Sequence, residues 1–94
     1  MPKVSAKGDT SDWPYPVIEY LQQKLTAEEL LARATDNDKQ TEAHAYIGLA
    51  LSLNGEREAA LEHLRWVREN GNRNFVEYPL ALSELARLEA AASN

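Results

Sequence analysis

Apolar residues recur at helical spacing in five stretches of this chain, and each stretch is bounded by residues that begin or end helices. The first stretch follows the proline-rich segment 13–16, where proline is tolerated because the amides of a first helical turn have no intrahelical partner. Val17, Ile18 and Leu21 then share one face. The pattern predicts a helix that ends near Lys24.

A short second helix is predicted over about residues 27–34. Thr26 and Glu29 have the spacing of a capping box, in which the hydroxyl accepts from an amide three residues on and the carboxylate reaches back to the capping amide. Leu30 and Leu31 follow as the start of an apolar face. The helix should therefore begin directly after Thr26.

The third predicted helix is long and has apolar residues on two faces. Asn37 or Asp38 is expected to cap it, and Gly55 is expected to end it after about Leu53, because glycine accepts a left-handed backbone. One stripe contains Ala43, Ile47, Ala50 and Leu51, and the other contains Tyr46, Leu49 and Leu53. We expect this helix to be covered on more than one side.

Two further helices are predicted towards the C-terminus. The fourth covers about residues 56–70 and ends at Gly71, with a core stripe made of Ala60, Leu64 and Val67. The fifth can be capped through Asn74-x-x-Glu77, although Pro79 sits late for a first turn and allows a start at Tyr78 or an irregular opening. Its inward residues are expected to be Tyr78, Ala81, Leu82, Leu85 and Leu88.

Composition agrees with an all-α fold of about five helices. The chain of 94 residues is rich in Ala, Leu and Glu, so one small helical domain over residues 13–92 is predicted, preceded by a flexible leader at 1–12 that is too polar to repay its ordering. A net charge of −5 argues against nucleic-acid binding. No apolar run approaches the ~20 residues of a membrane span, and the compartment stays open, with the cytoplasm slightly favoured.

Sequence motifs for catalysis, metal or cofactor binding are missing. There is no cysteine, no glycine-rich phosphate loop and no nucleophile elbow, so we expect no enzyme, no cofactor and no metal site. His44 and His63 are expected to be half-buried packing residues, with a pH-sensitive contact as the alternative. Trp66 is expected to pack against the last helix, with an exposed interaction anchor as the alternative.

Residues 41–74 resemble a tetratricopeptide repeat, a helical hairpin of about 34 residues. The residues that carry the resemblance are Glu42, Ala43, Ile47, Gly48, Ala50, Leu51, Gly55, Ala60, Leu64 and Val67. Gly48 is expected to let the second helix of the hairpin approach closely. His44 and Asn72 differ from the residues usual in the family, and Val67 completes the inner face in place of the usual alanine. The hairpin before residue 41 is short, and the last helix resembles a capping helix. The resemblance implies a short right-handed α-solenoid.

Tetratricopeptide-like proteins bind partner segments in a groove lined by the first helix of each hairpin. Carried over to this chain, the resemblance implies a partner-binding set made of Glu42, Ala45, Leu49, Ser52, Leu53, Arg73 and Asn74. The periodicity places Leu49 and Leu53 on the stripe that the core of the hairpin does not need. Two such anchors, each contributing ~1.5–3 kcal/mol if buried, together with polar contacts from Glu42 and Arg73 that orient the segment, predict micromolar and not nanomolar affinity.

The sequence therefore predicts a non-enzymatic protein-interaction module that binds a protein or peptide segment in a helical groove. The alternative is a structural role, as the C-terminal capping unit of a larger repeat protein or as a unit that associates with itself, including as a homodimer. A third hypothesis is an accessory domain tethered to a catalytic domain, which predicts the same sequence features as the interaction module.

Overall fold

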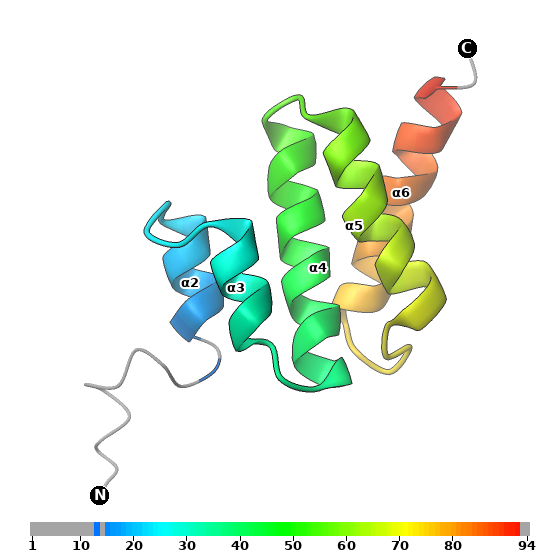
Figure 1. Cartoon of the computed structure of the whole chain (residues 1–94). Helices are drawn as coiled ribbons and strands as arrows, with labels where there is room; N and C mark the ends of the chain where they lie inside the picture. Colours follow the sequence, from blue (N-terminus) through cyan, green and yellow to red (C-terminus); the bar gives the residue numbers. More distant parts are fainter. Residues whose placement is uncertain (1–12, 14, 93–94) are drawn as a thin grey trace, which may run out of the picture.

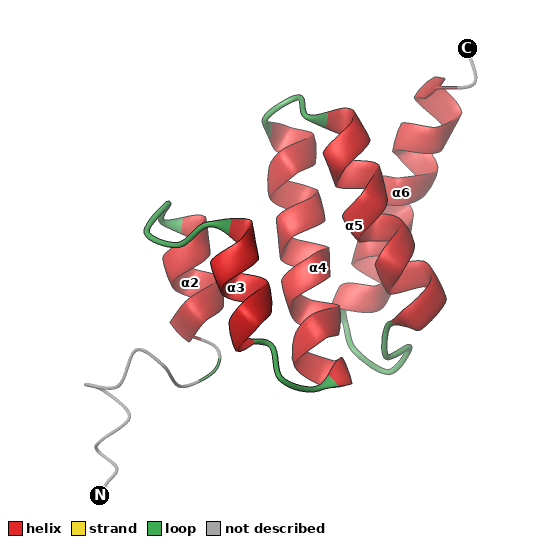
Figure 2. Ribbon diagram, viewed as in Figure 1, coloured by secondary structure: helices red, strands yellow, loops and turns green. Residues whose placement is uncertain are grey.

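The fold is all-α, as predicted. The computed structural model describes residue 13 and residues 15–92, and the predicted leader at 1–12 lies outside the described residues. These described residues form five α-helices and no strand (Figure 2). The helices are α2 (Tyr15–Leu21), α3 (Ala27–Arg33), α4 (Asn37–Leu53), α5 (Arg57–Asn70) and α6 (Glu77–Ala92).

Successive helices run in opposite directions (Figure 1). The helices α2 and α3 form a short hairpin, α4 and α5 form a long one, and α6 packs against both helices of the long hairpin. As a result α2, α4 and α6 all run in one direction, and α4 lies between the short hairpin and the α5–α6 pair (Figure 1).

The N-terminal caps of α3 and α4 follow from local chemistry. The Thr26 hydroxyl accepts from the Glu29 amide at 3.1 Å, and the Glu29 carboxylate accepts from the Thr26 amide at 2.9 Å, which confirms the capping box. The cap of α4 is Asp36, whose carboxylate accepts from the Lys39 amide at 2.8 Å. The prediction of Asn37 or Asp38 as this cap was wrong by one or two residues, because Asp36 already has the extended backbone of a cap.

The helix α2 ends three residues earlier than predicted. Gln23 adopts a positive φ of 67°, a left-handed conformation that glycine usually supplies. The Gln23 amide donates to the Tyr20 carbonyl at 2.9 Å, and the Lys24 amide donates to the Glu19 carbonyl at 2.8 Å. This pair of bonds is a Schellman motif, which stops the helix at Leu21.

The prediction for the end of α4 and for its close contact with α5 is confirmed. Gly55 has a φ of 81°, in the left-handed region, directly after the helix. A Cβ atom on Gly48 would lie 2.6 Å from the side chain of Leu64 on α5, so only glycine permits this approach of the two helices. The crossing also buries Ala60 completely.

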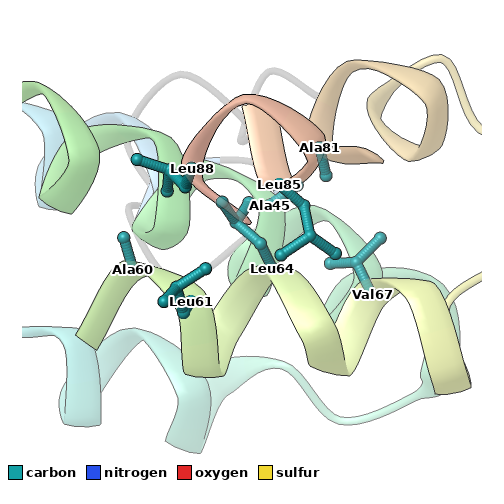
Figure 3. Packing of buried hydrophobic residues seen from close by; sticks show 8 residues of the cluster. All are labelled: Ala45, Ala60, Leu61, Leu64, Val67, Ala81, Leu85 and Leu88. Atoms are coloured by element: carbon teal, nitrogen blue, oxygen red, sulfur yellow. The ribbon is translucent and has the colours of Figure 1, made fainter. Parts of the chain in front are cut away.

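The larger of two apolar clusters joins α4, α5 and α6 (Figure 3). Its buried residues are Ala45, Ala60, Leu61, Leu64, Val67, Ala81, Leu85 and Leu88. Leu64 and Leu85 have almost no exposed surface, and Trp66, Tyr78 and Leu82 pack at the edge. The predicted inward stripes of α5 and α6 are thus confirmed, although Tyr78 and Leu82 are only half-buried. Pro79 falls in the first turn of α6.

The second cluster joins α2, α3 and α4. Its buried residues are Val17, Leu30, Ala34, Ala43 and Ile47. Trp13, Tyr20 and Tyr46 pack against it from the edge. Since Ala45 belongs to the first cluster while Ala43 and Ile47 belong to the second, α4 is covered on two sides as expected.

Candidate functional site

The predicted partner-binding set does not form one surface. Ala45 is completely buried in the larger cluster, so it is removed from the set: in this fold no partner can reach it. Glu42, Leu49 and Ser52 are half-buried on α4. Leu53, by contrast, exposes 88% of its surface and is the most exposed large apolar residue described.

Arg73 and Asn74 lie near the opposite end of α4 from Leu53. They belong to the exposed turn between α5 and α6, where the Asn74 amide donates to the Asn72 side chain at 2.9 Å. Asn72 in turn donates from its backbone to Thr41 at 2.9 Å and from its side chain to Asp38 at 2.8 Å, both near the start of α4. A 17-residue helix is about 25 Å long, so a single side chain of a partner does not contact both this turn and Leu53.

Glu42 takes part in a polar network near the start of α4. Its carboxylate accepts a hydrogen bond from the Trp13 indole, and one turn further along the helix the Tyr46 hydroxyl donates to Glu77 at 3.1 Å. Burial raises the pKa of Tyr46, and the carboxylates of Glu77 and Glu42 raise it further. Glu42 therefore ties the segment before α2 to α4, while Tyr46 ties α4 to α6.

Ser52 is bound to α6. Its hydroxyl donates to the Glu84 carboxylate, and the Arg87 guanidinium donates to the Ser52 oxygen at 3.2 Å. The hydrogen bond from Arg87, followed by the one from Ser52, lowers the pKa of Glu84. This group of three links the C-terminal half of α4 to α6.

A hollow of about 240 Å³ lies between the end of α2 and the end of α4. It is lined by Tyr20, Leu21, Gln23, Leu25, Ala50 and Asn54. Leu53 lies next to Asn54 in the chain and one turn beyond Ala50 on α4, so it neighbours two lining residues without lining the hollow itself. Hereafter we call this feature the α2–α4 hollow.

Sequence reasoning singled out Leu53, but none of the predicted partner-binding residues lines the α2–α4 hollow. One wall of the hollow comes from the turn after α2, whose shape depends on the left-handed backbone of Gln23. A glutamine gives no sequence signal for this conformation. A Gly at the same position would have indicated it.

The histidines and Trp66 form a separate group between α4 and α5. The Nδ1 atoms of His44 and His63 are 2.9 Å apart, and the His44 ring stacks on Trp66 with ring centres 4.2 Å apart. Burial, followed by the nearby His63, lowers the pKa of His44 to about 4. Burial also lowers the pKa of His63, partly opposed by the Glu62 carboxylate. Both histidines are half-buried, as predicted, and Trp66 packs against the larger cluster.

No protein-family model matches this sequence, and no solved structure matches it. Within residue 13 and residues 15–92, no group of three or more His, Asp or Glu side chains is placed to hold a metal ion. None of the helices described is long and apolar enough to cross a membrane.

Proposed function

We propose that this chain is a tetratricopeptide-like interaction module that binds a short protein segment at the α2–α4 hollow. The single observation that supports the proposal is the α2–α4 hollow itself, a concave site beside an apolar side chain, Leu53, that is 88% exposed. Leu21, which lines the hollow, is also 51% exposed, and a concave site with exposed apolar side chains beside it is typical of binding sites. The parallel course of α2, α4 and α6 is also the arrangement that the resemblance implies for groove-lining helices.

The proposed site is narrower than the set carried over from the family. Leu53 and Leu21 would contact apolar side chains of the partner, and Tyr20 and Asn54 would offer hydrogen bonds at the wall. Leu49 is half-buried one turn before Leu53 and would contribute only its exposed edge. The net charge of −5 favours a partner segment that carries positive charge.

The test is selection of a phage-displayed library of random peptides on the wild-type protein. Selected peptides are then measured against Leu53→Lys by isothermal titration calorimetry. We expect micromolar binding to the wild type and at least a tenfold loss in the variant, since burying an apolar side chain is worth ~1.5–3 kcal/mol. Val76→Lys is the matched control, because Val76 is 78% exposed in the turn between α5 and α6, which bonds to the start of α4 and not to the end that lines the hollow.

Leu53→Lys should leave the far-ultraviolet circular dichroism spectrum unchanged, because an 88% exposed side chain has little packing to lose. Leu53→Lys tests binding better than Leu49→Lys does, because Leu49 is half-buried and its substitution would change both the stability of the fold and the affinity for the peptide. Peptides that bind the wild type and Leu53→Lys equally well would refute the proposed site. A library that yields no peptide would count against segment binding as a whole.

Self-association is a second candidate, favoured by exposed apolar residues in the turn before α6 and in the first turns of α6. Val76 and Leu80 expose 78% and 52% of their surface. A second copy packed on this face would make the chain a structural unit. Size-exclusion chromatography with light scattering over a broad concentration range tests it: a dimer that Leu80→Lys dissociates would support self-association, and a monomer throughout would favour segment binding.

A further inference from the structure

The two histidines of the chain face each other across the α4–α5 hairpin. His44 lies on α4 and His63 on α5, and their Nδ1 atoms are 2.9 Å apart. The rings have centres 5.1 Å apart and are tilted by 35°. One Nδ1 must donate the proton and the other accept it, so each helix contributes one ring nitrogen to this hydrogen bond.

The separation of the nitrogens fits two neighbouring positions around a metal ion. With metal–nitrogen bonds of about 2.0 Å, two nitrogens 2.9 Å apart subtend about 93° at the metal. Square-planar and octahedral ions place neighbouring ligands at a right angle, whereas a tetrahedral site needs the nitrogens about 3.3 Å apart. The geometry therefore suits Cu²⁺ or Ni²⁺ better than Zn²⁺. With ring centres 5.1 Å apart, the two lone-pair directions point largely at each other, so each ring has to turn about χ2, a broadly distributed torsion, to direct its nitrogen at the ion.

Charge and burial also suit a cation. Metals bind the neutral imidazole, and burial keeps the pKa of both rings below the ordinary histidine value, so the rings are uncharged at neutral pH. The Glu62 carboxylate acts on His63 with a favourable negative charge. Both histidines are only half-buried, so part of each residue is accessible to solvent.

We propose that His44 and His63 form a two-histidine binding site for a divalent transition-metal ion, with Cu²⁺ bound most tightly. Copper is favoured because divalent affinities of nitrogen ligands peak at Cu²⁺. On binding, the proton between the two Nδ1 atoms is displaced and the donor ring is protonated at Nε2 instead, so no net proton is released. Water fills the remaining positions, since the described residues offer no third ligand. The bound ion would join α4 to α5.

The experiment uses tag-free protein with the substitution Trp13→Phe. The chain has two tryptophans, so Trp66 is then its only one, and it stacks on His44 with ring centres 4.2 Å apart. Copper sulfate titrated in a non-coordinating buffer should quench Trp66 fluorescence and saturate at one equivalent. A chelator should restore the signal. In the same background, His63→Gln should weaken the binding by roughly tenfold or more.

Pulsed electron paramagnetic resonance provides a second readout that does not depend on the variant. The chain has no other histidine and no cysteine, so the remote ring nitrogens of coordinated imidazole can come only from His44 and His63. Circular dichroism checks that His63→Gln is folded, and His63→Phe replaces it if it is not. Equal quenching of the Trp13→Phe protein with and without His63→Gln, or a copper spectrum without imidazole nitrogen, would overturn the proposal.

Discussion

The two halves of this molecule differ in the length of their helices and in how they are stabilised. In the C-terminal half, α4, α5 and α6 contain 17, 14 and 16 residues and surround the larger apolar cluster. In the N-terminal half, α2 and α3 contain only 7 residues each. Helices this short are not stable alone in water, so the α2–α3 hairpin depends on packing against Ala43 and Ile47 of α4.

The comparison teaches that stability is graded along the chain. Loss of the larger cluster removes the surface on which the short hairpin rests, whereas loss of the smaller cluster leaves most of α4–α6 packed. Unfolding should therefore proceed in two steps, with the hairpin opening first. The following predictions test this order, beginning with the largest effect.

Leu64→Ala should unfold both halves together. Leu64 is completely buried beside Gly48, and removing its side chain leaves a cavity that costs about 3–5 kcal/mol of unfolding free energy. Urea unfolding followed by circular dichroism should show one transition at a much lower midpoint. Leu80→Ala, at a half-exposed position of α6, is the control and should change little. A midpoint close to wild type would contradict the proposed role of the larger cluster.

Leu30→Ala should detach only the short hairpin. Leu30 is completely buried in the smaller cluster, and removing its side chain costs about 2–5 kcal/mol of packing free energy. Two helices of seven residues each have too little stability of their own to make up for this loss. Hydrogen exchange by mass spectrometry should show fast exchange at residues 15–33 and retained protection in α5. The exposed Leu21→Ala is the control. Equal loss of protection in both halves would mean that the molecule unfolds in one step.

Mild acid should weaken the larger half through His44. The pKa of His44 falls from the ordinary 6.5 to about 4 on folding, because burial and the neighbouring His63 disfavour its charged form. Between these two values the unfolded chain binds more protons, so stability falls as the pH falls through this window and levels off below it. Urea midpoints of chelator-treated protein at several pH values should show the loss. His44→Phe should reduce this pH dependence, and an unchanged profile would contradict the assignment.

Gln23→Gly should stabilise the short hairpin slightly. Gln23 has a φ of 67°, where a residue with a Cβ atom pays a steric cost. Removing this cost should outweigh the extra conformational entropy that glycine loses on folding, for a net gain of about 0.5–1 kcal/mol. Slower hydrogen exchange at residues 15–33 measures the gain. Gly55→Ala is the matched opposite, because Gly55 has a φ of 81° with no atom within 4 Å of an added Cβ, so its cost is conformational alone. Faster exchange in Gln23→Gly would contradict this reasoning.

Local signals predicted most of the fold. The Thr26–Glu29 capping box, the glycine after α4 and the stripe with Ala43 and Ile47 each depend on neighbours in sequence, and all are confirmed. The second predicted stripe of α4 is wrong, because Ala45 joins the larger cluster in place of Leu49 and Leu53, and Leu53 is exposed. Contacts between distant residues could not be read in this way. Ser52 pairs with Glu84 on α6, and only the packing of these helices brings the two side chains together.

The candidate site was predicted less completely than the fold, for the same reason. Leu53 stood out because the core stripe of its helix did not need it. Ala45 was assigned to the groove by resemblance, but its small side chain lies where α5 and α6 close over α4. The left-handed Gln23, which shapes the opposite wall of the α2–α4 hollow, has no local signature in the sequence.

The α2–α4 hollow has one wall in the less stable half of the molecule and the other in the more stable half. Any occupant that needs both walls binds only when the short hairpin is docked, so its binding free energy adds to that of docking. At a hundredfold excess over the dissociation constant this thermodynamic linkage is worth about 2.7 kcal/mol. Occupancy would then be visible as slower opening of α2 and α3, even though most of the hairpin does not touch the ligand.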